Sequence, residues 1–281
     1  MRRAIFLMLF TIVCLKTVEA AVPRATTPGR IITLNGALTE TVDALGLGKN
    51  IVAVDVTSTY PAYAARLPKV SKNRSVSAEG LLAFRPDVVL SPAGSLSKEI
   101  EFQLKAAGIK VVNIRQNFSV AGTSQFIKEV SNALGVPQKG AAVARATEMK
   151  VSKALNMVKQ SKKTVKVLFI YARGTGVMMV AGRNTSVDAI INLAGGTNAA
   201  SSFDDFKPYT TEALVEANPD VILMFDFGFS SLGGTESILK IPGMLQTKAG
   251  KNKKIIEMDS GLLINFSTRL DQAVSQLNSK L

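Results

Sequence analysis

One segment that occurs twice constrains the fold of this chain more than any other feature. Residues 79–90 read Glu-Gly-Leu-Leu-Ala-Phe-Arg-Pro-Asp-Val-Val-Leu, and residues 212–223 read Glu-Ala-Leu-Val-Glu-Ala-Asn-Pro-Asp-Val-Ile-Leu. In each copy a helix must end before the proline, and the Pro-Asp turn then leads into an apolar run typical of a buried strand. The duplication predicts two lobes of the same architecture rather than one large sheet.

Short aliphatic runs alternate with longer amphipathic ones in both halves of the chain. We expect strands at 30–34, 51–56, 88–90, 109–114, 165–171, 177–180, 221–224 and 254–258. We expect helices at 38–45, 78–84, 98–107, 186–193, 212–217 and 269–277. Alternating strands and helices favour parallel pairing. The pattern therefore predicts an α/β fold with two similar lobes, residues 21–137 and 164–281, each a mainly parallel sheet flanked by helices.

A single long helix is predicted between the lobes, over residues 138–163. This stretch has no proline, and Val143, Thr147, Val151, Leu155 and Val158 recur at helical spacing. A flexible linker would be rich in Gly, Ser and Pro. We therefore expect a helix that holds the two lobes apart, with a cleft between them.

The first twenty residues have the pattern of a secretory signal peptide. Arg2 and Arg3 precede the apolar run 4–15, and Val18-Glu19-Ala20 offers a cleavage site. A signal anchor is the alternative. The only cysteine, Cys14, follows Val13, whereas a lipoprotein signal has a small residue before its cysteine. We therefore expect an exported protein that is not a lipoprotein.

The chain has no histidine, and after removal of residues 1–20 it would have no cysteine. That composition excludes most hydrolytic triads, zinc sites and thiol chemistry. The formal net charge is +13. Scattered lysines and few aromatic residues argue against nucleic acid as a partner, so the charge indicates solvated surface with a bias toward anionic ligands.

The motifs resemble a known family at this point. The paired Glu-x-Leu-x₄-Pro-Asp-Val segments and the long connecting helix are similar to the class III substrate-binding proteins of ABC importers. Further segments are similar to the periplasmic heme-binding branch: 57–61 (Thr-Ser-Thr-Tyr-Pro), 77–81 (Ser-Ala-Glu-Gly-Leu), 180–183 (Val-Ala-Gly-Arg), 193–196 (Leu-Ala-Gly-Gly) and 207–212 (Lys-Pro-Tyr-Thr-Thr-Glu). The resemblance covers the chain from Arg30 onward and implies that heme is the transported ligand.

Tyr60 is the residue that the resemblance identifies as the axial ligand of the heme iron. It follows a predicted strand, and binding loops of parallel sheets lie at the carboxyl ends of strands. A phenolate is a hard anionic donor suited to ferric iron. A half-buried tyrosine with a hydrogen-bonded hydroxyl is the alternative. The resemblance also places Arg74 close to this ligand.

Some relatives complete the second axial position with a histidine, which this chain lacks. The iron would then be five-coordinate, or water or another side chain such as Met178, Met179 or Tyr209 would fill the site. We also predict ligand contacts from Arg183, Lys207, Tyr209 and Phe227, with Phe225 and Phe229 as further aromatic candidates. For Arg173 we favour an ordinary surface position.

Glu79 and Glu212 are the predicted docking residues. The resemblance implies that one glutamate on each lobe pairs with arginines of an ABC permease dimer, to which the protein would bind as a monomer. A glutamate near a helix N-terminus is also favourable for the helix itself.

Two other functions stay open. A siderophore or corrinoid carrier would share the fold and the docking glutamates. An exported enzyme would have to rely on carboxylates such as Asp55 or Asp226, and no paired-acid motif supports it.

Overall fold

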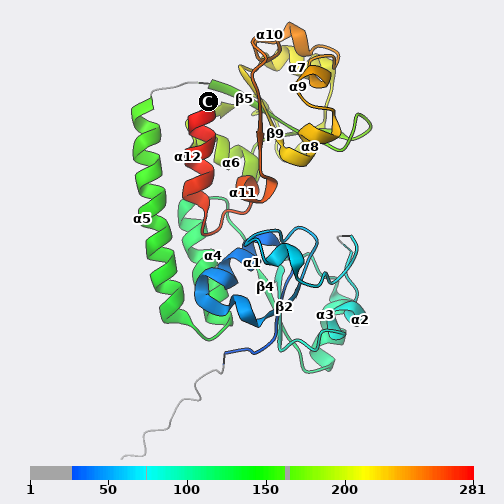
Figure 1. The fold of residues 1–281 in the computed structure, drawn as a ribbon, viewed down its shortest axis with the longest axis vertical. Coiled ribbons are helices and arrows are strands. Elements are labelled where there is room, and N and C mark those ends of the chain that lie inside the picture. Colours follow the sequence, from blue (N-terminus) through cyan, green and yellow to red (C-terminus); the bar gives the residue numbers. More distant parts are fainter. Residues whose placement is uncertain (1–26, 74, 162–164) are drawn as a thin grey trace, which may run out of the picture.

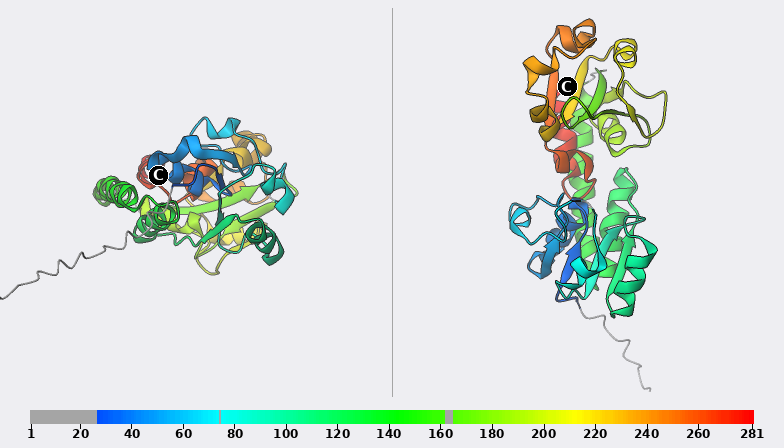
Figure 2. Two further views of the ribbon diagram at one scale, coloured as in Figure 1. Left: turned by 90° about the horizontal axis from the view of Figure 1, so that it is seen from below. Right: turned by 90° about the vertical axis from the view of Figure 1, so that its right-hand side faces the viewer.

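The computed structural model describes residues 27–73, 75–161 and 165–281. Two lobes lie one above the other, and one long helix runs along the same side of both (Figure 1; Figure 2). None of the helices in these ranges has the length and apolar character needed to cross a bilayer.

The N-terminal lobe holds a four-stranded sheet in the order β2-β1-β3-β4, in which all pairs are parallel. Its elements are β1 (Ile31–Thr33), α1 (Gly36–Val42), η1 (Asp43–Leu47), η2 (Gly48–Asn50), β2 (Ile51–Val54), η3 (Ala64–Arg66), α2 (Ala78–Leu82), β3 (Val88–Pro92), α3 (Lys98–Ala106), β4 (Lys110–Ile114) and α4 (Val120–Ala133).

The C-terminal lobe holds a second sheet in the order β10-β9-β5-β6-β8, and β7 also pairs with β5. Its elements are β5 (Val165–Ala172), β6 (Met178–Ala181), α6 (Ser186–Leu193), β7 (Gly196–Asn198), β8 (Phe206–Pro208), α7 (Thr211–Ala217), β9 (Val221–Phe225), α8 (Asp226–Ser231), α9 (Thr235–Ile238), η4 (Met244–Gln246), α10 (Lys248–Lys251), β10 (Ile255–Met258), α11 (Ser260–Ile264) and α12 (Leu270–Lys280). The β5–β6 and β6–β8 pairs are antiparallel, and the other pairs are parallel. The predicted fold of two mainly parallel, helix-flanked sheets is confirmed.

The repeated Pro-Asp motif makes the same contacts in both lobes. Asp87 accepts a hydrogen bond from the Arg30 amide at 2.8 Å and donates its own amide to the Arg30 carbonyl at 2.9 Å. Asp220 accepts from the Lys166 amide at 2.9 Å and donates to the Lys166 carbonyl at 2.8 Å. Each pair of bonds sets the register of the following strand, so Ile31 lies opposite Val88 and Val167 opposite Val221.

The helix before each motif also ends in the same way. Arg85 and Asn218, the residues before the two prolines, both have left-handed backbones, with φ of 45° and 40°. The freed carbonyls are capped by cationic side chains: Arg30 donates to Phe84 at 2.7 Å and Lys166 donates to Ala217 at 3.0 Å. The sequence repeat is therefore a structural repeat down to single hydrogen bonds.

Each sheet is covered on both faces, which explains why its central strands are apolar throughout. In the N-terminal lobe, one face packs against α1 and α4, and the other packs against α2 and α3. In the C-terminal lobe, α6 and α12 cover one face, while α7, α9 and η4 cover the other.

The long helix α5 (Pro137–Ser161) contributes to the cores of both lobes. Val143 packs against the N-terminal core, whereas Val151, Leu155 and Val158 belong to or pack against the C-terminal core. The predicted apolar face of this helix is thus confirmed. At about 1.5 Å per residue its 25 residues extend roughly 37 Å. The residues at which each lobe begins and ends stay a prediction.

Candidate functional site

A cleft of about 1260 Å³ lies between the lobes. The N-terminal lobe lines it with residues that follow β1, β2, β3 and β4, including Asn35, Thr57, Thr59, Ser95 and Gln116. The C-terminal lobe contributes residues at the end of β5, in α8 and in α11. The carboxyl ends of parallel strands from both sheets therefore face the same space, which is where α/β folds bind ligands. Among the described residues, no cluster of His, Cys, Asp or Glu could hold a metal ion by itself.

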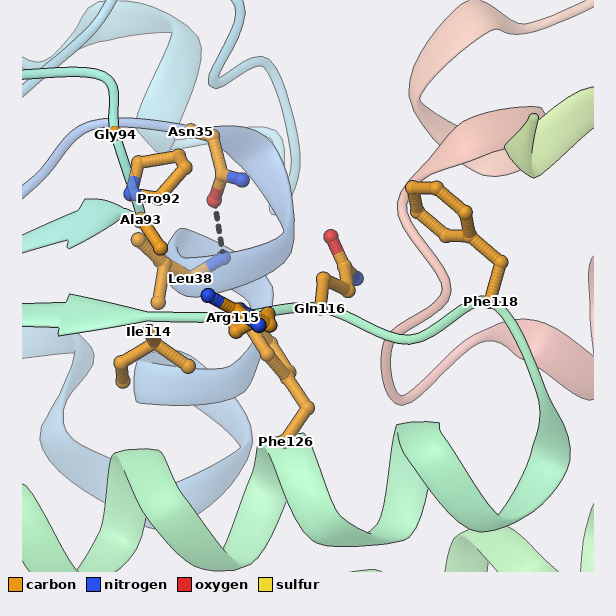
Figure 3. A pocket seen from close by; sticks show the side chains of 10 residues that line it. All are labelled: Asn35, Leu38, Pro92, Ala93, Gly94, Ile114, Arg115, Gln116, Phe118 and Phe126. Carbon is orange, nitrogen blue, oxygen red and sulfur yellow. Dashed lines mark hydrogen bonds between the residues drawn. The ribbon is translucent and has the colours of Figure 1, made fainter. Parts of the chain in front are cut away.

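A smaller recess of about 420 Å³ opens beside the cleft in the N-terminal lobe. It shares Asn35, Pro92, Gln116 and Phe118 with the cleft wall. Figure 3 shows Arg115 at the end of β4 among the side chains that line this recess. The cleft thus has a side chamber with one cationic residue in an otherwise mostly uncharged lining.

The loop that carries Tyr60 is held by a buried chain of hydroxyl groups. Asp55 accepts hydrogen bonds from the Thr57 hydroxyl at 2.5 Å and from the Ser58 hydroxyl at 2.6 Å. Ser58 is also bonded to Thr39 at 2.7 Å, and Thr39 to Thr33 at 2.6 Å. The Thr-Ser-Thr-Tyr-Pro motif therefore has a local structural reason: its first two hydroxyls tie the loop to the end of β2. Both oxygens of Asp55 are engaged in this scaffold.

A partly buried lysine also supports this loop. Lys69 Nζ donates to the carbonyls of Ser58 at 3.0 Å and Ala64 at 3.1 Å. Burial lowers the pKa of this ammonium group, and the Asp55 carboxylate partly opposes that effect. The loop backbone is thus held both before and after Tyr60.

Tyr60 stands next to cleft-lining Thr59 and is 43% exposed. Its ring lies against the Arg269 guanidinium, whose carbon is 3.6 Å from the ring centroid. Tyr60 is not itself among the residues that line the cleft. Arg74, the other predicted residue of this region, lies outside the described residues.

The C-terminal wall of the cleft is aromatic. Tyr171 contacts Phe227 edge-on at 5.8 Å between ring centroids, and Phe225 lies 5.3 Å from Phe227. Arg173 donates from Nε to the Tyr171 hydroxyl at 2.7 Å, and its guanidinium lies 4.9 Å from the Phe227 centroid. All four side chains line the cleft.

Phe227 thus lines the cleft, and Arg173, predicted as a surface residue, is exposed and also lines it. Tyr171 was not predicted as a site residue. The Tyr-x-Arg spacing at the carboxyl end of a predicted strand could have identified it, because alternate strand residues point to the same side of a sheet.

The other predicted ligand contacts lie away from the cleft lining. Arg183 forms an exposed ion pair with Asp204 at 2.9 Å. Lys207 lies over the Phe203 ring at 4.6 Å. The Tyr209 hydroxyl donates to the Pro242 carbonyl at 3.1 Å, and burial raises the pKa of this phenol. A role for Arg183, Lys207 and Tyr209 in ligand binding stays a prediction.

Glu79 and Glu212 have equivalent local positions. Each is exposed in the first turn of a short helix, α2 or α7. The helices begin in the same way, because Ser77 accepts from the Gly80 amide and Thr210 accepts from the Ala213 amide, both at 3.1 Å. The two carboxylates are therefore presented alike by the two lobes.

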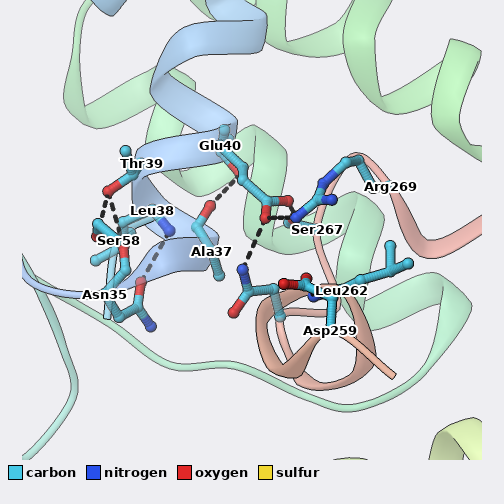
Figure 4. A network of polar contacts seen from close by, with 12 residues as sticks. Asn35, Ala37, Leu38, Thr39, Glu40, Ser58, Asp259, Leu262, Ser267 and Arg269 are labelled. Atoms are coloured by element: carbon cyan, nitrogen blue, oxygen red, sulfur yellow. Dashed lines mark hydrogen bonds and ion pairs between the residues drawn. The ribbon is translucent and has the colours of Figure 1, made fainter. Parts of the chain in front are cut away.

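A buried carboxylate of the N-terminal lobe contacts three residues of the C-terminal lobe (Figure 4). Glu40 in α1 accepts a hydrogen bond from Asn265 Nδ2 at 2.8 Å, one from the Ser267 hydroxyl, and an ion pair from Arg269 Nη2. The Glu40 side chain is 1% exposed and that of Arg269 is 13% exposed. We call these four residues the Glu40 network.

The geometry is that of a two-lobed protein with a cleft that could hold a ligand. The sequence also matches a protein-family model. The model described as periplasmic binding protein matches residues 31–262. This chain is a periplasmic binding protein.

Solved structures of heme-binding proteins are similar to this periplasmic binding protein along most of their length. RhuT from Roseiflexus sp. RS-1, a periplasmic heme-binding protein solved in apo form, is 38% identical with a TM-score of 0.85, covering 89% of this chain and 97% of RhuT. BhuT, a periplasmic heme-binding protein solved in complex with two hemes, is 37% identical with a TM-score of 0.84, and the coverage is 89% and 97%.

Among the curated relatives, one is uncharacterized and another is named for vitamin B12. The uncharacterized ABC transporter substrate-binding lipoprotein YvrC of Bacillus subtilis is 27% identical over 253 residues, which are 89% of this chain and 79% of YvrC. The vitamin B12-binding protein of Vibrio parahaemolyticus is 31% identical over 202 residues, which are 69% of each chain. Cys14, on which the prediction about lipidation rests, lies outside the described residues.

Proposed function

We propose that this periplasmic binding protein captures heme in the interlobe cleft and delivers it to an ABC importer, without catalysing a reaction. One observation carries the proposal: the likeness to RhuT, a heme-binding protein, at 38% identity over 89% of the chain. The aromatic wall formed by Tyr171, Phe225 and Phe227 supports it, because a flat porphyrin needs apolar surface on which to stack.

The iron would be held by tyrosine oxygen. The N-terminal lobe offers Tyr60 beside the cleft, and the C-terminal lobe offers Tyr171 in the cleft wall. The Arg173 side chain that donates to the Tyr171 hydroxyl would compensate the charge of a phenolate ligand. Because the chain has no histidine, Tyr171 is our candidate for the side chain that faces the iron from the C-terminal lobe.

A hemin titration tests this ligation. Wild-type protein should give a Soret band with the charge-transfer features of high-spin ferric phenolate. Tyr60→Phe should abolish those features, and Tyr171→Phe should change the spectrum only if the second lobe also ligates iron. Tyr209→Phe serves as the control, because the Tyr209 hydroxyl bonds to Pro242 away from the cleft lining. An unchanged spectrum and affinity in the Tyr60→Phe, Tyr171→Phe double variant would refute tyrosine ligation.

The same titration gives the stoichiometry. BhuT was solved with two hemes, and the present cleft of about 1260 Å³ is the larger of the two cavities described above. An endpoint of two hemin molecules per chain, reduced to one by either single tyrosine variant, would assign one porphyrin to each lobe.

A corrinoid is the second candidate ligand, favoured by the 31% identity to the vitamin B12-binding protein. Competition decides between the two. If cyanocobalamin displaces hemin at equimolar concentration, or binds when hemin does not, heme as the principal cargo is wrong.

We further propose that Glu79 and Glu212 dock the protein on the permease. Their support is equivalent exposure on equivalent capped helices. Glu79→Lys with Glu212→Lys should leave hemin affinity unchanged and abolish hemin-stimulated ATP hydrolysis by the reconstituted importer. Glu216→Lys, an exposed position on the same helix α7 as Glu212, is the matched control. Equal stimulation by the double variant and the control would contradict the docking role.

We also propose export by residues 1–20, with the mature chain starting at Ala21 in the periplasm. The intact mass of protein recovered from a periplasmic extract tests this. A mature chain that starts at Cys14 and carries lipid, as the name of YvrC would suggest, would contradict the prediction that this protein is not a lipoprotein.

A further inference from the structure

The contact between Tyr60 and Arg269 joins the candidate ligand loop to the opposite lobe. Tyr60 belongs to the loop after β2, whereas Arg269 directly precedes α12. The guanidinium carbon lies 3.6 Å from the ring centroid, which is close stacking for a cation–π pair. Among the described residues, the Tyr60 hydroxyl has no hydrogen-bond partner, so the ring face is its principal restraint there.

Arg269 is itself held firmly. Its side chain is 13% exposed, and Nη2 is paired with Glu40, which also accepts from Asn265 and Ser267. Because a planar guanidinium stacks flat on an aromatic face while its edge bonds a carboxylate, one side chain can perform both tasks. Within the described part of the chain, Arg269 Nε is buried without a hydrogen-bond partner, so the Glu40 pair does not use all of its donors.

A second interlobe contact lies next to this one. Gln116 Nε2 donates to the carbonyls of Asn265 and, at 3.2 Å, Phe266. Phe118 meets Phe266 edge-on at 5.4 Å between centroids. Gln116, Phe118 and Asn265 all line the cleft. The segment 265–269 therefore touches the cleft at one end and Tyr60 at the other.

We propose that Arg269 is a positioning residue for Tyr60, which holds the ring at the edge of the cleft and ties its orientation to the Glu40 network between the lobes. This inference rests on the proposed role of Tyr60 in heme ligation. The position of the Tyr60 loop and the contact of the C-terminal lobe with α1 then both depend on the Arg269 side chain.

A double-mutant cycle on the apo protein tests the contact without heme. Tyr60→Leu removes the aromatic ring, and Arg269→Lys keeps the charge for Glu40 but loses the planar stack. Any weakening of the Glu40 pair is the same in both Tyr60 backgrounds and cancels in the cycle. We expect Arg269→Lys to change the unfolding equilibrium constant about fivefold more in the wild-type background than in Tyr60→Leu.

Tyr63→Leu replaces Tyr60→Leu in the control cycle. Tyr63 lies in the same loop, and its hydroxyl donates to Asp43 at 2.7 Å rather than stacking on Arg269. We expect additive effects in the control. Additive effects in the Tyr60 cycle as well would overturn the proposal. If Arg269→Lys does not fold, the charge-neutral pair Glu40→Gln with Arg269→Gln takes its place in the same cycle.

Hemin release separates this proposal from the proposed function. Transfer of hemin to excess apomyoglobin should be about fivefold faster from Arg269→Lys than from wild type, with no such difference in the Tyr60→Leu background. If Tyr60→Phe keeps the wild-type hemin spectrum, the ligation is wrong, while the apo cycle still decides the contact. If Tyr60→Phe loses the ligand band but Arg269→Lys releases hemin at the wild-type rate, Arg269 does not position the ligand.

Discussion

Replacing the buried carboxylate of Glu40 should be among the most damaging single changes in this protein. Glu40→Gln keeps the shape of the side chain, but its single carbonyl oxygen can replace only one of the two carboxylate oxygens that accept from Asn265 and Ser267. It removes the negative charge that pairs with Arg269, whose side chain is 13% exposed. Breaking a buried ion pair by removing one partner costs about 3–5 kcal/mol. Because Arg269 keeps some contact with solvent, we expect the lower end, about 3 kcal/mol.

Urea denaturation followed by circular dichroism measures this loss, which corresponds to a fall in melting temperature of about 6–12 °C. Asp204→Asn is the matched control, since it breaks the Arg183–Asp204 pair, whose side chains are 53% and 57% exposed. An exposed pair of this kind contributes about 0–1 kcal/mol. Arg269→Met should then cost less in the Glu40→Gln background than in wild type, because the two charges depend on each other. A loss from Glu40→Gln no larger than that from Asp204→Asn would refute the reasoning.

Two further predictions concern the repeat and the long helix. The hydrogen bond from the Lys166 amide lowers the pKa of Asp220, helped by the nearby Lys248 ammonium. The folded pKa lies below the unfolded one, so Asp220 stabilises the protein above its unfolded pKa, and this contribution is lost as pH falls through the folded pKa. Asp220→Asn should thus cost about 1 kcal/mol at pH 7 and progressively less below pH ~4, and a pH-independent loss would count against it. Gly140→Ala should destabilise by about 1–3 kcal/mol despite the higher helix propensity of alanine, because an added Cβ would lie 1.8 Å from Ser131 Oγ in α4. Ser131→Gly should restore part of that loss in thermal unfolding, and a Gly140→Ala variant as stable as wild type would show that the α4–α5 contact is looser than described.

Much of the architecture could be predicted from local pattern. Arg85-Pro86-Asp87 and Asn218-Pro219-Asp220 each dictate a helix end, a turn and a strand start, because proline ends a helix and aspartate bonds nearby amides. The apolar face of α5 follows from the 3.6-residue period alone. These features depend on neighbours in the chain, and the structure agrees with them. The antiparallel strand β8 and the short helices α8 to α11 were not predicted, because each is too short to carry a periodic signal.

The site could be predicted only in part. Tyr60 was selected through the family resemblance of its motif and Phe227 because it follows a strand, and Phe227 does line the cleft. Arg183 and Lys207 were also predicted as ligand contacts from their sequence motifs. They lie near β8, however, and do not line the cleft. Sequence position indicates which end of a strand a residue occupies, but not which of several strand ends converge.

The sequence by itself determined that this protein has two lobes built alike, joined by one long helix, and that histidine cannot serve its binding site. Those conclusions follow from composition and from interactions between residues close in the chain. Only the tertiary structure decided that Tyr171 and Arg173 meet in the cleft wall opposite the Tyr60 loop, and that Glu40 is buried against Arg269 from the other lobe. Glu40 and Arg269 are 229 positions apart, and the facing of the two cleft walls likewise depends on burial and geometry that exist only once the two lobes have packed.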